Sequence, residues 1–372
     1  MGDETGREDA YRSAGVDYGV LDAAKRRSMQ AVLSSLEAPA DRGALVARET
    51  VGEPAQLVEV DGVQLATVLE CLGTKSEIAR EVEESLGIDR WEAIGIDAVA
   101  AIVNDLCCVG ALPISVSAYV ATGSAGWYSG PRHGSLVTGW QRACDEAGAA
   151  WVGGESPTLS GIVGEQSVDI AGSAIGRVPA GCRAWLGSRL EPGDEIVLVG
   201  SSGLHANGAS LARAVASSSA DGWASALPSG RTLGEAVLEP SLIYVRLVEA
   251  LQSSPLHDQV SYASHITGHG LRKLMRADRA LTYRVSDLPP VPEVLSWLSE
   301  RAGLDTAGAY GTFNMGAGFA IFTQAGSGES ICATAASVGL SAIVGGTVET
   351  GDRRVILEPL DIEYSSDELD LR

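Results

Sequence analysis

Residues 93–106 read AIGIDAVAAIVNDL, an apolar helical pattern that carries three polar side chains, Asp97, Asn104 and Asp105. At about 100° per residue, Asp97 and Asn104 fall within about 20° of one helix face, and Asp105 lies about 80° from Asp97. A carboxylate in apolar surroundings costs several kcal/mol unless a cation or hydrogen bonds compensate it. The spacing leaves two interpretations open: a metal or reacting group, or buried structural pairing with an arginine or backbone amides.

The composition indicates an acidic protein of two domains. The chain has 372 residues, of which 45% are hydrophobic, and a net charge of −21. That length exceeds one typical core, and we place a boundary near residue 180, between domains of residues 1–180 and 181–372. An acidic surface repels phosphodiester backbones and anionic membranes, so we expect no nucleic-acid or membrane partner.

The cysteines and the N-terminus favour a cytoplasmic location. None of the six cysteines forms a CxxC pair, which is typical of reduced thiols rather than of disulfides or zinc. Residues 1–4 are acidic and precede no apolar segment, so no signal peptide is expected. Asn104 and Asp105 interrupt the longest apolar stretch, so we also expect no membrane span.

Helical and strand-like patterns alternate in both halves, which predicts two α+β domains. The polar segment 1–20 is expected to be flexible or ordered by a partner. The expected helices cover residues 21–36, 96–109, 134–148, 208–216 and 240–251, with another starting at 271. The expected strands lie within residues 56–70, 114–120, 150–152, 168–178, 195–199, 262–270, 311–322 and 355–360.

Several common signatures are missing from the sequence. There is no GxxxxGK[ST], no GxGxxG, no GxSxG and no HExxH. His265 and His269 are four residues apart, but Gly268 and Gly270 argue against a helix that holds both histidines as metal ligands. We therefore interpret them as a pair of loop histidines.

Glycine loops remain as candidate binding elements. Residues 153–156, GGES, end a short strand, and residues 265–268, HITG, form a similar loop. Residues 200–208, GSSGLHANG, join a strand to a helix and offer amides, hydroxyls and a helix N-terminus to an anion. Within that loop, His205 could transfer a proton near neutral pH. A plain strand-to-helix turn explains this pattern equally well.

Four carboxylates accompany these loops: Glu70, Asp97, Asp105 and Glu155. Carboxylate oxygens, phosphate and water are the ligands that Mg²⁺ prefers. Each carboxylate alone is more often a solvated side chain. Together with phosphate-type loops they predict a magnesium–nucleotide site outside the P-loop class.

Over nearly its whole length the chain resembles the phosphoribosylformylglycinamidine cyclo-ligase family, also called aminoimidazole ribonucleotide synthetases. The order and spacing of the shared motifs match as well. The resemblance is carried by Tyr11–Asp17, Ile94–Asp97, Val103–Asp105, Tyr119–Gly123, Gly153–Glu155, Gly200–Gly208, Glu239–Tyr244, His265–Gly268 and Thr312–Gly316.

The resemblance implies a fold, a set of ligands and a reaction. It implies two α+β domains, an N-domain sheet that forms a shared barrel in a homodimer, and a C-domain α/β sandwich. It also implies ATP and Mg²⁺ in a cleft between the domains. The family phosphorylates an amide oxygen of a small-molecule substrate, an internal amine attacks, and phosphate leaves as an imidazole ring closes. Because ring closure is intramolecular, orientation can supply much of the rate.

The family's functional residues carry over to positions in this chain. Asp105 and His205 match substrate-contacting, acid/base positions, and Lys75 matches a phosphate-side lysine, so these three are the expected catalytic residues. The expected nucleotide-binding residues are Glu70, Gly73, Thr74, Asp97, Asn104, Gly153, Gly154, Asn207, Thr267 and Gly268. The expected metal ligands are Glu70, Asp97, Asp105 and Glu155.

This chain departs from the family pattern near the expected pocket. The family's Asp-Gly-Val-Gly-Thr-Lys is here ECLGTK at residues 70–75, so Glu70 replaces an aspartate and Cys71 replaces a glycine. His269 replaces the middle glycine of a Thr-Gly-Gly-Gly loop, and Ala118 replaces an aspartate. A glycine lost beside phosphate restricts the approach of the backbone.

These departures leave the substrate and the activity open. We interpret the chain as a diverged ATP-dependent cyclo-ligase that acts on a formylglycinamidine ribonucleotide-like substrate or on a related amide in specialised metabolism. The main alternative is a non-catalytic paralogue that binds a nucleotide or a metabolite. A hydrogenase-maturation or selenophosphate-type member is a weaker alternative, because those proteins lack the full series of motifs.

Overall fold

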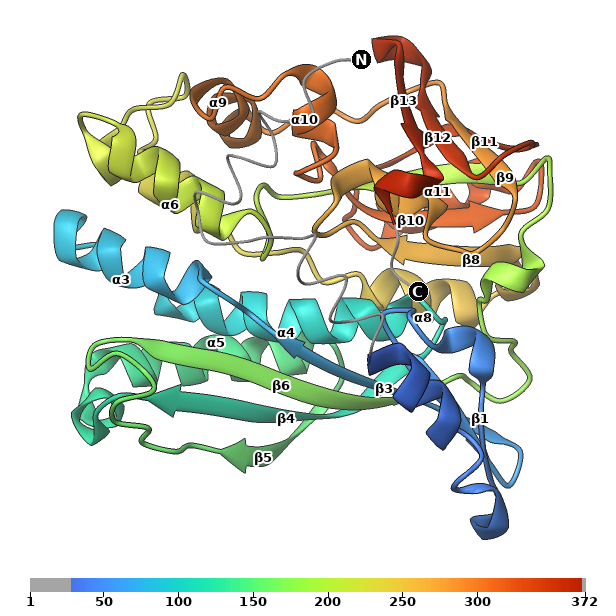
Figure 1. Ribbon diagram of the computed structural model, residues 1–372, viewed down its shortest axis with the longest axis horizontal. Helices are drawn as coiled ribbons and strands as arrows, with labels where there is room; N and C mark the ends of the chain where they lie inside the picture. Colours follow the sequence, from blue (N-terminus) through green and yellow to red (C-terminus); the bar gives the residue numbers. More distant parts are fainter. Residues whose placement is uncertain (1–27, 370–372) are drawn as a thin grey trace.

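The computed structural model describes residues 28–369, and Figure 1 shows how their elements are arranged. Three expectations lie outside these residues: the polar segment 1–20, the motif at 11–17 and the start of the helix at 21–36. Residues 28–35 of that helix are helical. Within residues 28–369, no helix is long and apolar enough to cross a membrane.

The N-terminal half is built on a six-stranded sheet whose strand order is β1-β2-β3-β6-β4-β5. Neighbouring strands are antiparallel, except that β4 and β5 are parallel. A turn at Asp61 and Gly62, both with positive φ, joins β2 to β3 as the sequence predicts. The strands are β1 (Ala44–Val46), β2 (Gln56–Val60), β3 (Val63–Cys71), β4 (Leu112–Thr122), β5 (Ala150–Glu155) and β6 (Val168–Arg177).

One face of this sheet is covered by helices, and the central one is α4 (Trp91–Cys107). It packs on β3, β4 and β6 on one side, and on α8 and β8 of the C-terminal half on the other (Figure 1). A helix that is covered on both sides is apolar around its whole circumference, which explains the uninterrupted apolar pattern. Besides the helical residues 28–35, this half contains the α-helices α3 (Lys75–Leu86) and α5 (Pro131–Glu146).

The C-terminal half is built on a seven-stranded sheet of order β13-β12-β9-β11-β7-β10-β8. Its strands are β7 (Glu195–Gly200), β8 (Val260–His265), β9 (Leu281–Val285), β10 (Ala317–Thr323), β11 (Ala342–Thr350), β12 (Arg354–Leu357) and β13 (Ile362–Ser365). Its helices are α6 (Ala209–Ser218), α7 (Leu233–Val237), α8 (Val245–Gln252), α9 (Glu293–Arg301), α10 (Thr306–Tyr310) and α11 (Gly328–Ser337). The expected two-domain α+β architecture is confirmed, and the proposed boundary near residue 180 falls between the two sheets.

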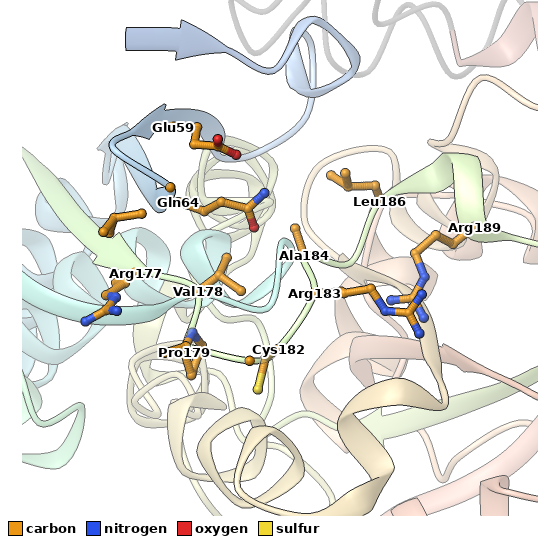
Figure 2. A pocket seen from close by; sticks show the side chains of 14 residues that line it. Glu59, Gln64, Arg177, Val178, Pro179, Cys182, Arg183, Ala184, Leu186 and Arg189 are labelled. Carbon is orange, nitrogen blue, oxygen red and sulfur yellow. The ribbon is translucent and has the colours of Figure 1, made fainter. Parts of the chain in front are cut away.

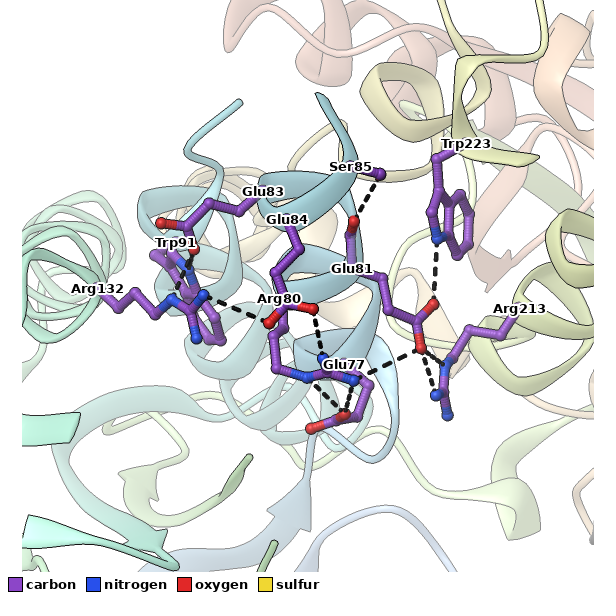
Figure 3. Close-up of polar contacts among 10 residues, drawn as sticks. All are labelled: Glu77, Arg80, Glu81, Glu83, Glu84, Ser85, Trp91, Arg132, Arg213 and Trp223. Atoms are coloured by element: carbon purple, nitrogen blue, oxygen red, sulfur yellow. Dashed lines mark hydrogen bonds and ion pairs between the residues drawn. The ribbon is translucent and has the colours of Figure 1, made fainter. Parts of the chain in front are cut away.

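Polar contacts fasten α3 to the C-terminal half, as Figure 3 shows. Glu81 on α3 accepts hydrogen bonds from Arg213 Nε at 3.1 Å and from Trp223 Nε1 at 3.1 Å. At the start of the same helix, the hydroxyls of Thr74 and Ser210 lie 3.0 Å apart. These contacts hold α3 against α6, and thereby fix the position of the Gly-Thr-Lys segment that begins α3.

Candidate functional site

A cavity of about 580 Å³ lies between the two halves of the molecule. Its volume is typical of a small-molecule site. It is lined by the end of β3, by the segments that precede α3 and α6, and by the loop after β8. Of the expected site residues, those that line it are Glu70, Gly73, Thr74, Asp105, Asn207, Thr267 and Gly268.

Glu70 and Asp105 both line this cavity, and the two carboxyl groups influence each other's ionisation. Burial and the neighbouring Asp105 raise the pKa of Glu70 to about 7, although Lys273 opposes the shift. Burial also acts against ionisation of Asp105, but the His265 hydrogen bond and the charges of Lys273 and Arg276 outweigh it and lower the pKa of Asp105. Asp105 is therefore the ionised member of the pair, and Glu70 holds the proton below about pH 7.

Asp105 is oriented by His265 at the end of β8. The distance from His265 Nδ1 to Asp105 Oδ1 is 2.7 Å, and both residues are buried. The sequence analysis interpreted His265 as one of a pair of loop histidines at the start of a candidate binding loop. The structure instead places His265 as the partner of a carboxylate, an arrangement that fixes the direction in which Asp105 presents its other oxygen.

Two basic residues that the sequence analysis missed, Lys273 and Arg276, line the same cavity. Lys273 Nζ donates a hydrogen bond to Thr267 Oγ1, and burial together with the charge of Arg276 lowers the pKa of Lys273 to about 8. Arg276 Nη2 donates to the carbonyl of Gly52 at 2.7 Å, and its Nε lies 3.4 Å from Glu53. The sequence feature that could have indicated them is the group of basic residues in LRKLMR at residues 271–276.

Asp97 lies outside the cavity and is paired structurally. Lys75 Nζ is 2.6 Å from Asp97 Oδ2, and neither side chain is exposed. Asp97 Oδ1 accepts hydrogen bonds from the Ser241 amide at 2.8 Å and the Ser241 hydroxyl at 2.5 Å. Of the two interpretations that the spacing left open, the structure shows pairing for Asp97, with a lysine as the cation.

Asn104, on the same face of α4, also binds the segment before α8. Its Nδ2 donates to the Leu242 carbonyl at 2.9 Å, and its Oδ1 accepts from the Tyr244 amide at 2.9 Å. Asp97 and Asn104 thus hold one extended segment of the C-terminal half. For this reason the helix expected at 240–251 begins only at Val245.

His205 is buried behind the cavity. Its backbone has φ 59°, and its Nε2 accepts a hydrogen bond from the Ser202 amide at 3.2 Å. Its Nδ1 is buried without a hydrogen-bond partner among residues 28–369. Burial, with smaller contributions from the charges of His265 and Lys75, lowers the pKa of His205 well below its usual value. His205 is therefore a neutral imidazole, and the structure brings neither it nor Lys75 to the cavity wall.

Gly153, Gly154 and Glu155 also lie elsewhere, on the exposed edge strand β5. The two glycines line a separate cavity of about 200 Å³ beside Trp140 and Trp151. The four expected metal ligands are therefore not brought together. Within residues 28–369, no group of three or more His, Cys, Asp or Glu side chains is arranged to hold a metal ion.

Glu70 and Asp105 are the pair that fits Mg²⁺. The ion commonly uses one or two carboxylates and completes its shell with water and substrate phosphates. Burial and then the neighbouring Asp105 raise the pKa of Glu70, so added positive charge would favour the ionised form of this carboxyl group. A divalent cation bound by phosphate would supply that charge.

The segments before α3 and α6 provide backbone amides that could hold a phosphate group. Gly73 and Thr74 precede α3, and Asn207 and Gly208 precede α6, so two helix N-termini are directed toward the cavity. Gly208 has φ 88°, and a Cβ there would lie 2.5 Å from the Phe313 ring. Both the positive φ and the packing against Phe313 favour glycine at this turn.

His269, which stands where the family pattern has a glycine, has a backbone conformation typical of glycine. His269 adopts φ 72°, which lies in the left-handed region that glycine favours. A non-glycine residue there costs roughly 1–2 kcal/mol. The loop retains a glycine-like conformation despite the substitution.

The fold and the site define a two-domain α+β protein with a charged cavity, suited to a phosphorylated small molecule, between its halves. The chain belongs to the AIR synthase related protein family. Residues 52–178 match the model of the N-terminal domain of that family, and residues 191–358 match the model of its C-terminal domain. The family membership expected from the motifs is thereby confirmed.

Two relatives with curated names are phosphoribosylformylglycinamidine cyclo-ligases. The phosphoribosylformylglycinamidine cyclo-ligase of Synechocystis sp. is 32% identical over 92% of this chain and 97% of its own length. The enzyme of the same name from Carboxydothermus hydrogenoformans is 32% identical over 94% of this chain and 99% of its own length.

Solved structures share the fold at lower identity. One structure, titled AaThiL complexed with AMPPCP and TMP, has a TM-score of 0.59 at 16% identity and covers 90% of this chain and 94% of its own. The hydrogenase maturation protein HypE in complex with ATP has a TM-score of 0.57 at 20% identity, over 81% of this chain and 83% of its own. At these identities the likeness concerns the fold alone.

Proposed function

We propose that this protein is an ATP-dependent cyclo-ligase that activates an amide and closes a ring by forming a C–N bond. The observation that carries the proposal is the cavity between the two halves. It is lined by an oriented Asp105, by the basic residues Lys273 and Arg276, and by the segments that precede two helices. The names of relatives that are similar over more than nine-tenths of the chain support the same reaction.

ATP would transfer a phosphoryl group to the amide oxygen and so convert that oxygen into a leaving group. An amine of the same substrate would then attack the amide carbon, and the oxygen would depart as part of inorganic phosphate. Asp105, held by His265, would accept the proton that the amine loses. Lys273 and Arg276, with the amides before α3 and α6, would hold phosphate oxygens. Exclusion of bulk water by the two halves would keep the activated carbon from hydrolysis.

Mg²⁺ would be held by Glu70 and Asp105 and would neutralise charge on the phosphates. Lys75 and His205, expected to be catalytic, lie outside the cavity, so we assign them positioning roles through Asp97 and the loop before α6. The substrate we propose is a formylglycinamidine ribonucleotide-like compound or a related amide.

We further propose a homodimer formed through the open face and the edge of the first sheet. Large apolar side chains are exposed there: Leu69 is 76% exposed, Val152 61% and Ile175 47%. Apolar exposure of this extent on one sheet marks an interaction surface. A cytoplasmic location is proposed because all six cysteines, which lie in the described part of the chain, are free thiols.

The test measures release of ADP and phosphate, with Mg²⁺, over a panel of formamidine and amide substrates. We expect stoichiometric ADP and phosphate with at least one amine-bearing amide, and a cyclised product by mass spectrometry. Asp105→Asn is the matched inactive control. Intact ATP binding without turnover of any substrate would overturn the proposal in favour of a non-catalytic nucleotide-binding paralogue.

A further inference from the structure

A second cavity, of about 480 Å³, lies where the chain passes from the first sheet to the second (Figure 2). Its walls are the β2–β3 hairpin, the end of β6 and the segment of residues 178–189. It shares no lining residue with the cavity that contains Glu70 and Asp105. It is therefore a separate site, with Gln64 from the first half facing the connecting segment.

The charge of this second cavity is opposite to that of the whole chain. The sequence has 48 acidic and 27 basic residues, yet this lining contains three arginines, Arg177, Arg183 and Arg189, and one carboxylate, Glu59. Figure 2 shows the side chains of Arg183 and Arg189 converging on one side, with Arg177 on the opposite side. Two guanidinium groups held together repel each other unless anionic groups compensate them.

The compensation present is incomplete. Arg183 Nη2 lies 3.0 Å from Asp258 Oδ1, and Arg189 Nη2 donates to the Asp258 backbone carbonyl at 3.1 Å. Arg189 Nη1 is buried and has no hydrogen-bond partner among residues 28–369. The charges of Asp258 and Asp194 both act on Arg189, yet one buried donor of its guanidinium group remains without a hydrogen-bond partner among the described residues. Burial and then the charge of Arg183 lower the pKa of Arg189, although Asp258 and Asp194 oppose the shift.

We propose that this cavity is a binding site for a small phosphate-type oxyanion, held by Arg189 and Arg183. A planar guanidinium offers parallel N–H donors that match the oxygens of phosphate, and charge-assisted bonds of this kind are strong. The anion would give Arg189 Nη1 a partner and would add negative charge to a lining that has three arginines and one carboxylate. A ligand here would contact the hairpin and the connecting segment together, and would stiffen the junction between the two halves. The site does not depend on the reaction proposed above.

The test is hydrogen–deuterium exchange of the full chain with inorganic phosphate, against sodium chloride of equal ionic strength. We expect slower exchange in residues 178–190, by about tenfold at a phosphate concentration ten times Kd. Arg189→Met should abolish this protection, and so should Arg183→Met, whose exposed side chain can change without loss of folding. The matched control is Arg142→Met, an exposed arginine paired with Glu92.

Two results in the unmodified chain would overturn the proposal: no protection of residues 178–190 by phosphate, or protection confined to residues that line the first cavity. It would also be overturned if Arg189→Met and Arg183→Met were protected as strongly as the unmodified chain, or if acetate protected as strongly as phosphate. Because the local exchange is measured segment by segment, failure here is distinguishable from failure of the cyclo-ligase proposal, which ADP and phosphate release tests separately.

Discussion

Lys75 and Asp97 form an ion pair of 2.6 Å in which neither side chain is exposed to solvent. Lys75 is the first residue of α3, Asp97 lies within α4, and Asp97 also accepts two hydrogen bonds from Ser241 of the C-terminal half. The pair therefore joins three parts of the chain around the first cavity. A buried charge without its partner is far more costly than a buried pair.

We expect Asp97→Asn to destabilise the protein by about 3–5 kcal/mol, because the ammonium of Lys75 then lies buried without a carboxylate. Urea unfolding of the variant measures the change. The double substitution Lys75→Met with Asp97→Leu should regain much of this loss, because both charges disappear together. A single variant within about 1 kcal/mol of the unmodified chain would contradict a structural role for the pair.

Asp105→Asn should lower kcat by about 10²–10⁴-fold, the usual contribution of a positioned acid or base. The asparagine keeps the shape of the side chain but cannot accept the amine proton. Circular dichroism should show an unchanged fold. Asp145→Asn, on the exposed surface of α5, is the control and should retain full activity. Unchanged turnover in Asp105→Asn would remove Asp105 from the reaction.

The raised pKa of Glu70 predicts a pH dependence of stability in the absence of Mg²⁺. The folded protein binds a proton at Glu70 up to about pH 7, whereas the unfolded chain loses it near the ordinary value of 4.5. The free energy of unfolding should therefore fall as pH rises from 4.5 to 7, by at most about 1.4 kcal/mol per pH unit. Urea unfolding at several pH values measures the slope, and Glu70→Gln should flatten it. The same slope in both proteins would assign the effect to another group.

Glu70→Asp should change the dependence of activity on Mg²⁺ concentration. The shorter side chain draws the carboxylate back toward β3 and away from Asp105, so the two can no longer share a cation in the same geometry. Activity is measured against Mg²⁺ at saturating ATP. An unchanged curve would exclude Glu70 from the metal site, whatever the effect of Asp105→Asn.

The sequence predicted the main elements of the fold because their patterns are local. The apolar run at 93–106 is a helix, and the expected strand at 195–199 matches β7. The late start of α8 could not be predicted, because Asp97 and Asn104 hold the backbone of residues 241–244 from far away in the sequence. Helix propensity summed over a short stretch of sequence does not include contacts with distant residues.

The residues of the candidate site could likewise be predicted only in part, because their arrangement depends on contacts between distant parts of the chain. Asp105 and Glu70 were chosen from motifs, and the structure brings them together in one cavity. Lys273 and Arg276 were missed because residues 270–275 form a short 3-10 helix, which has no strong periodic signal. Lys75 and Asp97 match family positions, yet their mutual pairing depends on how α3 and α4 pack, which spacing does not specify.

The glycine at 208 provides a test of the phosphate side of the cavity. Gly208 and Gly230 have nearly equal backbone angles, φ 88° and φ 87°, but differ in surroundings. A Cβ at 208 would lie 2.5 Å from the Phe313 ring, whereas a Cβ at 230 would meet nothing within 4 Å. Phe313 is buried and cannot move aside freely.

Gly230→Ala should therefore cost only the strain of the left-handed conformation, roughly 1–2 kcal/mol. Gly208→Ala should cost about 1–3 kcal/mol more, because it overpacks the core against Phe313. Since Gly208 also lines the cavity, only that variant should raise the KM for ATP. Equal losses of stability and an unchanged KM in both variants would show that the turn before α6 neither requires glycine for packing nor approaches the nucleotide.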